Sequence, residues 1–136
     1  MMKVTGGCHC GNITYEAEVD PATVRVCHCT DCQKLTGTAF RANIASLPGA
    51  FRLTRGTPKI YIKTAESGTK RAHGFCPECG TPIYATSTEP SPSTYGLRVG
   101  GIDQRSLLAP PFRQIWCRSA LPWSMDLRAV QQAARE

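Results

Sequence analysis

The sequence predicts a small, mainly β domain with an unusual set of clustered cysteines. Three observations support this prediction: a segment with alternating side chains, several short β-type segments between turn signals, and eight cysteines grouped in motifs. Residues 13–19 alternate apolar and polar side chains, which is typical of a strand with one buried face. With 136 residues and 41% hydrophobic composition, the chain is long enough for one domain over residues 1–136 with its own core.

The other expected elements follow in chain order. Further short strands are predicted at residues 39–46, 59–64, 82–86, 95–100 and 112–117. Turn signals rich in glycine, proline or serine separate them, at residues 47–49, 55–58, 66–68 and 89–92. A short helix is predicted at residues 30–35, within the second cysteine motif. A C-terminal helix is predicted at residues 125–135, because Leu127, Val130 and Ala134 recur at helical spacing.

Composition and charge exclude several classes of protein. No stretch approaches the ~18 consecutive apolar residues of a membrane span, and the N-terminal residues lack a secretory signal pattern. The net charge of +6 comes from scattered Lys and Arg residues without interleaved aromatics, so binding to nucleic acid is not expected. We therefore expect a cytoplasmic protein in a reducing compartment.

The cysteines form a C-x-C motif, a C-x-C-x-x-C motif, a C-P-x-C-G motif and one single residue. They are Cys8, Cys10, Cys27, Cys29, Cys32, Cys76, Cys79 and Cys117. An even count also permits a disulfide framework. Disulfides between cysteines two residues apart are strained, whereas thiolates that converge from one side are what a metal needs. The spacing therefore favours metal binding.

The motif Cys76-Pro77-Glu78-Cys79 has a second interpretation, as a redox pair at a helix N-terminus. Gly80 and Pro82 follow directly, and the proline would break such a helix in its second turn. A glycine after the second cysteine suits the tight knuckle of a zinc site. We therefore expect a zinc knuckle here.

Seven clustered cysteines divide into a site of four and a site of three. Structural zinc has four protein ligands, whereas catalytic zinc has three and keeps one position open. Cys27, Cys29 and Cys32 are local enough to form one site alone. The first and last motifs would then form the other and clamp two distant parts of the chain together. An alternative remains open, in which Cys117 completes a four-thiolate site with the middle motif.

These motifs resemble the glutathione-dependent formaldehyde-activating enzyme family, which includes the centromere protein V group. The resemblance rests on Gly-Cys-His-Cys-Gly at residues 7–11, Cys-His-Cys-Thr-Asp-Cys-Gln-Lys at residues 27–34, and Phe-Cys-Pro-Glu-Cys-Gly-Thr at residues 75–81. The Pro122-Trp123 pair is similar to the family's C-terminal signature. Two positions depart from it: Gln114 stands where a histidine is frequent, and Ser124 where an acidic residue is frequent.

The resemblance implies a small zinc-bound fold of stacked antiparallel sheets, shared with zinc-bound Rab accessory proteins and methionine sulfoxide reductase B. It also implies two Zn²⁺ ions. The implied ligands are Cys8, Cys10, Cys76 and Cys79 for a structural zinc and Cys27, Cys29 and Cys32 for a catalytic zinc.

A zinc held by three thiolates is a weak Lewis acid that suits binding of a further thiol, whose sulfur then attacks an electrophile. The implied activity is that of a carbon–sulfur lyase, S-(hydroxymethyl)glutathione synthase, with glutathione and formaldehyde as small-molecule partners. Two alternatives stay open: a non-catalytic zinc-stabilised module that binds proteins, and a lyase that acts on another thiol adduct.

Other side chains are weaker candidates for roles at the site. Lys34 is a candidate contact for glutathione. His28 and His9 lie between cysteines and are expected to point away from the metal, and His73 is expected at the surface. Large apolar residues usually fill a core, which is the expectation for Tyr95, Trp116 and Trp123. Cys117, in an apolar segment, is expected to be a buried free thiol.

Overall fold

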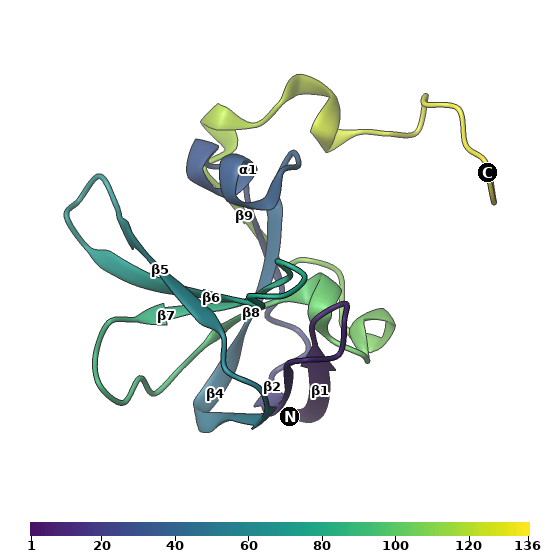
Figure 1. Ribbon diagram of the computed structural model, residues 1–136. Helices are drawn as coiled ribbons and strands as arrows, with labels where there is room; N and C mark the ends of the chain where they lie inside the picture. Colours follow the sequence, from purple (N-terminus) through teal and green to yellow (C-terminus); the bar gives the residue numbers. More distant parts are fainter.

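The computed structural model describes residues 1–136 and consists mainly of antiparallel strands, with one short α-helix (Figure 1). The strands are β1 (Met2–Gly7), β2 (Thr14–Val19), β3 (Arg25–Cys27), β4 (Arg41–Arg55), β5 (Lys59–Thr64), β6 (Lys70–Phe75), β7 (Pro82–Ser87), β8 (Gly96–Arg98) and β9 (Arg113–Ile115). The helix α1 spans Thr30–Thr36. Short 3₁₀ turns lie at Val99–Gly101, Arg105–Leu107, Cys117–Ser119 and Pro122–Met125.

The strands pair in the order β1-β2-β4-β8-β7-β6-β5. Outside this order, β3 pairs with both β4 and β9. All pairs are antiparallel except β3 and β9, which run parallel. Three of the strands, β1, β3 and β6, were not anticipated from the sequence. The predicted mainly β class with antiparallel sheets is confirmed.

The long strand β4 belongs to two sheets and connects them. Its first part pairs with β3 and β8, and its second part pairs with β2. The β2 register jumps from Val19–Ser46 to Ala17–Phe51, and Gly49 has a φ of 70° in the segment between. The predicted turn at residues 47–49 is therefore a corner inside β4, and the strand predicted at residues 39–46 is only its first half. A bulge with a left-handed glycine bends a strand without ending it.

The apolar faces of the sheets meet in one core, and 12 buried residues form a connected cluster there. Residues 14–19 alternate as predicted, with Tyr15, Ala17 and Val19 buried. Tyr95 packs against the core and stacks on Phe51 with a centroid distance of 4.2 Å. The expectation that Tyr95 helps to fill the core is confirmed.

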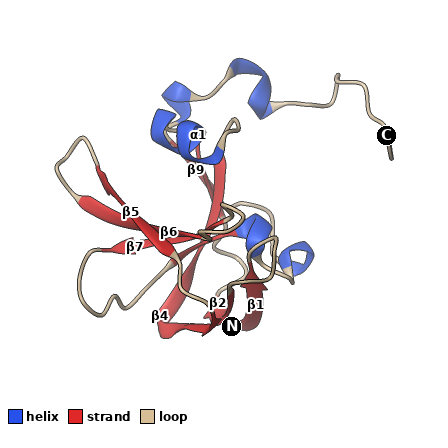
Figure 2. Cartoon of the chain, viewed as in Figure 1, coloured by secondary structure: helices blue, strands red, loops and turns tan.

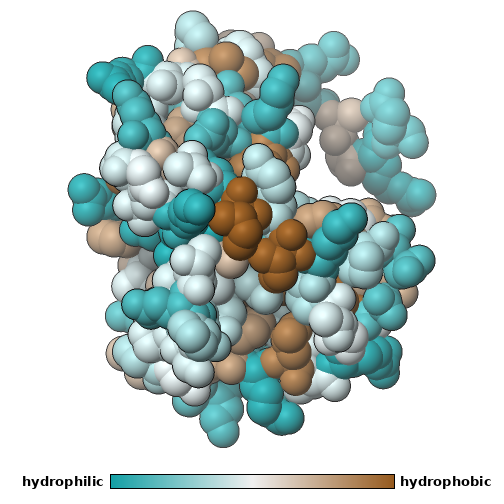
Figure 3. Space-filling model, turned by 60° about the vertical axis from the view of Figure 1, so that its left-hand side comes forward, coloured by the Kyte–Doolittle hydropathy of each residue, from teal (hydrophilic) through white to brown (hydrophobic).

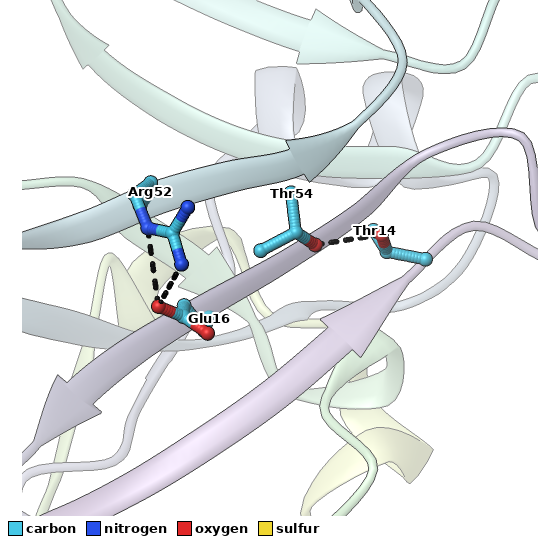
Figure 4. Close-up of polar contacts among 4 residues, drawn as sticks. All are labelled: Thr14, Glu16, Arg52 and Thr54. Carbon is cyan, nitrogen blue, oxygen red and sulfur yellow. Dashed lines mark hydrogen bonds and ion pairs between the residues drawn. The ribbon is translucent and has the colours of Figure 1, made fainter.

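The outer face of β2 and β4 carries paired polar side chains (Figure 4). Arg52 donates to Glu16 Oε1 from Nε at 3.1 Å and from Nη2 at 2.6 Å. The hydroxyls of Thr14 and Thr54 are 2.7 Å apart. These cross-strand pairs lie at the surface, where they contribute little to stability but satisfy their own charges and hydrogen bonds.

The predicted C-terminal helix at residues 125–135 is wrong. Helical structure ends with the 3₁₀ turn at Pro122–Met125, and the chain then leaves the body as a loop (Figure 2). Leu127 and Val130 are exposed, so the apolar stripe has no surface to pack on. A helix of this length is marginal in water unless one face is buried.

Two further expectations for the C-terminal region are also wrong. Trp116 and Trp123 are 46% and 57% exposed, so neither fills the core. The strand predicted at residues 112–117 ends at Ile115, because Trp116 adopts a left-handed φ of 57° and a 3₁₀ turn follows. That turn exposes Cys117, which is not the expected buried thiol.

The surface is mostly hydrophilic, with small apolar areas. The side of the molecule that carries the β5–β6 hairpin comes forward in Figure 3, where apolar atoms gather in the middle of a largely polar face. In β5, the neighbouring residues Ile60, Tyr61 and Ile62 are exposed. None of the helices has the length and apolar character needed to cross a membrane.

Candidate metal centres

The first and last cysteine motifs form one cluster. The sulfurs of Cys8, Cys10, Cys76 and Cys79 all lie within 4.8 Å of one another. Cys8 and Cys10 follow β1, whereas Cys76 and Cys79 lie between β6 and β7. The cluster therefore connects two hairpins that are distant in sequence.

Backbone amides turn toward these sulfurs. The Ile13 amide donates to Cys8 Sγ at 3.1 Å, and the Glu78 and Cys79 amides approach Cys76 Sγ at 3.4 and 3.5 Å. Gly80 has a φ of 78° and donates to the Cys76 carbonyl, which makes the tight turn. The second loop has the knuckle conformation that the sequence predicts, and no helix starts at the motif.

The middle motif forms the second cluster, in which the sulfurs of Cys27, Cys29 and Cys32 lie within 4.8 Å of one another. Cys27 ends β3, and Cys32 lies in the first turn of α1. Cys29 is the N-cap of α1, and its sulfur accepts a hydrogen bond from the Cys32 amide at 3.1 Å. Cys27 and Cys32 are buried, whereas Cys29 is partly exposed. No fourth histidine, cysteine or carboxylate belongs to this cluster.

His28 holds the middle motif to the rest of the fold. Its side chain is 1% exposed, and its ring Nε2 is 2.8 Å from Gln114 Oε1 on β9. The Gln33 amide group donates to the His28 carbonyl and to the Ser119 carbonyl. His28 is therefore a buried positioning residue, and Gln114, one of the two departures from the family pattern, is its partner.

Both clusters fit zinc in donor type, and the four-cysteine cluster also fits it in the spacing of its sulfurs. Four sulfurs at 2.3 Å from a tetrahedral ion lie about 3.8 Å apart, and the Cys8–Cys10 and Cys10–Cys76 sulfur distances are 3.6 and 3.8 Å. All eight cysteines are free thiols. Thiolate ligands favour zinc over harder cations such as Mg²⁺ and Ca²⁺, which prefer oxygen ligands. Both clusters can therefore hold metal ions.

Hydrogen bonds, burial and neighbouring cysteines shift the pKa values of thiols in both clusters. Hydrogen bonds from the side chain and backbone of Thr81 lower the pKa of Cys79 to about 5. Burial raises the pKa of Cys32, and the adjacent Cys29 and Cys27 raise it further. Burial also opposes ionisation of Cys29, but hydrogen bonds from Cys32 and Cys27 and the charge of Lys63 together outweigh it and lower the Cys29 pKa. A divalent cation would stabilise all thiolates of one cluster together.

Sequence reasoning did not identify the basic residues beside the middle cluster. Arg41 pairs directly with Cys27 across β3 and β4, and its side chain is buried. Arg98 on β8 is also buried and donates to Asn43 Oδ1 at 2.7 Å. Its Nη2 is 3.2 Å from His73 Nδ1. His73 is half-buried, so the expectation that it lies at the surface is wrong. The sequence feature that could have identified Arg41 and Arg98 is an arginine within a short apolar strand, because burying a charge is costly.

The remaining candidates lie apart from the three sulfurs. Lys34 is exposed on α1 and borders a shallow hollow with Leu121 and Trp123. Its predicted contact with glutathione stays a prediction. Cys117 is exposed and belongs to neither cluster, so the alternative in which it completes the middle site is not supported. His9 is exposed, and its backbone amide donates to the Thr81 hydroxyl at 3.0 Å.

These features define a β protein in which clustered cysteines form metal sites. Residues 3–119 match the family model described as glutathione-dependent formaldehyde-activating enzyme, and the chain belongs to this family. The family is enzymatic and acts in glutathione-dependent activation of formaldehyde. The fold is also similar to a crystal structure of a Rhodobacter sphaeroides protein, a structural genomics target. The TM-score is 0.59 at 24% sequence identity, and the match covers 81% of this chain and 98% of that one.

Proposed function

We propose that this protein is a zinc-dependent carbon–sulfur lyase that forms S-(hydroxymethyl)glutathione from glutathione and formaldehyde. The observation that supports this function best is the middle cluster, which has three converging sulfurs and no fourth protein donor. Three-ligand zinc with one open position is typical of catalytic sites. Family membership supports glutathione and formaldehyde as the partners.

In this proposal the two clusters have separate roles within one zinc-binding unit over residues 1–136. The cluster of Cys8, Cys10, Cys76 and Cys79 holds a structural zinc and fastens the β1–β2 hairpin to the loop between β6 and β7. Cys27, Cys29 and Cys32 hold the catalytic zinc. Eight free thiols suit a reducing compartment, so a cytoplasmic location is part of the proposal.

The chemistry joins a thiol sulfur to a carbonyl carbon. Zinc at the middle cluster would hold the thiol in its open position and favour loss of the thiol proton. The S–H bond breaks, a C–S bond forms to the aldehyde carbon, and the carbonyl oxygen takes up a proton to become a hydroxyl. Cys27 and Cys32 are buried whereas Cys29 is partly exposed, so in this proposal the substrate approaches the metal from the side of Cys29.

The Cys29→Ser variant tests this function, with Cys117→Ser as the matched control. We expect Cys29→Ser to keep its fold, to lose one of two zinc ions, and to lose at least about 100-fold in glutathione-dependent exchange of formaldehyde. Metal analysis and exchange spectroscopy by NMR measure the two effects. Full exchange activity in a folded Cys29→Ser protein with one zinc would refute the proposal. Two zinc sites with only protein ligands would favour the non-catalytic module, and an unreactive open site would favour a lyase for another thiol adduct.

A further inference from the structure

Two buried arginines line a cavity whose wall has no cysteine but includes residues close in sequence to both cysteine clusters. Its volume is about 330 Å³, which is within the range of small-ligand sites. The wall runs from Leu35 on α1, three residues after Cys32, to Gly80, the neighbour of Cys79. Arg41 and Arg98 contribute the charge.

Strand register places this charge on the same face as the middle cluster. Cys27 lies directly opposite Arg41 in the antiparallel β3–β4 pair, so both side chains leave the same face of the sheet. Asn43, two residues along β4, lies opposite Arg98 on β8. The hydrogen bond from Arg98 to Asn43 is consistent with this shared face. The arginines therefore leave the sheet on the same face as Cys27, and their charges act on Cys32 of the middle cluster.

Neither arginine has an acidic partner. Arg41 and Arg98 are 7% and 9% exposed, and the Nε atoms of both are buried without a hydrogen-bond partner. The ion pairs in the protein involve Arg52, Lys63 and Arg128 instead. A buried guanidinium is costly unless an anion pairs with it.

A second, larger hollow of about 670 Å³ serves as a comparison, because the arginine in its wall has an acidic partner. It lies over β1, β2 and β4, and its wall includes Arg52 together with its ion-pair partner Glu16. Both residues are drawn in Figure 4, where the Arg52 guanidinium donates to the Glu16 carboxylate. The wall of that hollow contains no buried cation without an acidic partner, so it carries no comparable demand for an anion.

The charge around the smaller cavity remains unbalanced when the metal site is counted. Three thiolates around a divalent cation carry one negative charge, which offsets one arginine. Lys63, whose charge lowers the pKa of Cys29, is already paired with Asp31 at 3.0 Å. Burial and the charge of Arg41 lower the pKa of Arg98 to about 9, so the Arg98 guanidinium stays charged at neutral pH. At least one positive charge is left while no substrate thiolate is bound to the metal.

We infer that this cavity is a carboxylate subsite of the three-cysteine site, in which Arg41 and Arg98 bind a carboxylate of the thiol substrate. The inference rests on the proposed function for the position of the thiol sulfur. Guanidinium groups bind carboxylates in charge-assisted pairs. The expected substrate class is therefore an anionic thiol, and glutathione, which has two carboxylates and one amine, belongs to it. Neutral or cationic thiols of similar size are expected to be poor substrates.

The test compares ligands that lack a free thiol, so that sulfur binding to the metal does not contribute. S-methylglutathione keeps both carboxylates, and its diethyl ester removes them. We expect S-methylglutathione to bind the zinc-loaded wild-type protein in calorimetry, and its diester to bind at least about tenfold more weakly. Equal affinity for acid and ester, or no binding of the acid at millimolar concentration, would overturn the inference. This comparison needs no variant.

Variants assign the effect to residues. We expect Arg41→Gln and Arg98→Gln each to weaken S-methylglutathione binding about tenfold or more, and the exposed Arg52→Gln to leave it unchanged. Zinc content checks that each variant is folded. Unchanged affinity in folded Arg41→Gln and Arg98→Gln proteins would overturn the inference.

The two proposals fail in different ways. If formaldehyde exchange with glutathione proceeds but acid and ester bind equally, the carboxylate subsite is wrong and the proposed function stands. If the arginines bind S-methylglutathione but no exchange is detected, the proposed reaction is wrong and the subsite stands.

Discussion

The two cysteine clusters use the same donor atom but differ in completeness and in surroundings. The cluster between the hairpins has four sulfurs, and backbone amides donate to Cys8 and Cys76 within it. The cluster at α1 has three sulfurs and lies beside two buried arginines without acidic partners. A complete set of ligands leaves a metal no free position, so it can only stabilise the fold. An incomplete set beside unpaired charge leaves room for a substrate.

The largest difference is expected when each cluster loses one ligand. Cys76 is fully buried in the four-cysteine cluster. Structural zinc contributes about 10–16 kcal/mol in small zinc domains, which is comparable with the whole stability of a domain. We therefore expect Cys76→Ser to unfold the protein at 25 °C, whereas Cys29→Ser keeps it folded. Circular dichroism and thermal unfolding measure this, with Cys117→Ser as the unchanged control. A folded Cys76→Ser protein with wild-type stability would remove the distinction between the clusters.

An intermediate effect is expected from the contact that holds the middle motif in place. Gln114→Leu removes the oxygen that pairs with the buried His28 ring and should lower the free energy of unfolding by about 1–2 kcal/mol. Gln114→Glu keeps an accepting oxygen and should recover most of this loss. Urea unfolding measures both. Equal destabilisation by the two substitutions would show that the hydrogen bond is not the cause.

A smaller effect is expected at the knuckle of the four-cysteine cluster. Gly80 has a φ of 78°, and a Cβ there would meet no atom within 4 Å, so the strain in Gly80→Ala is that of the backbone alone. The expected loss in the free energy of unfolding is about 1–2 kcal/mol. Gly100→Ala is the control, because its Cβ also meets nothing and its φ is not positive. Equal stability of both variants would contradict the assigned role of the turn.

The three-cysteine cluster was predictable from sequence because its members are neighbours in the chain, whereas the grouping of the first and last motifs was expected from the family resemblance. Two or three thiols within six residues already limit the sites that can form, and Gly80 and Pro82 exclude a helix at the last motif. The alternation in residues 13–19 likewise predicted a half-buried strand, which the structure places at Thr14–Val19.

The parts that were not predicted depend on long-range contacts. Residues 47–49 have the local sequence pattern of a turn, and only the pairing of β4 with β8 before them and with β2 after them shows that the strand continues. The C-terminal apolar stripe has helical spacing but no surface that buries it. Arg41 and Arg98 are 57 residues apart and belong to no motif, so only strand register brings them to one cavity.

The most direct test of the central claim is cadmium-113 NMR of the cadmium-substituted protein, because cadmium is a soft metal that thiolates also bind. We expect two resonances, of which one disappears in Cys29→Ser. Addition of glutathione should shift that same resonance, as a fourth sulfur joins the three-cysteine site, and leave the other unchanged. Two resonances that both stay unshifted on addition of glutathione would contradict an open metal position at the three-cysteine site, since both sites would then be complete without substrate.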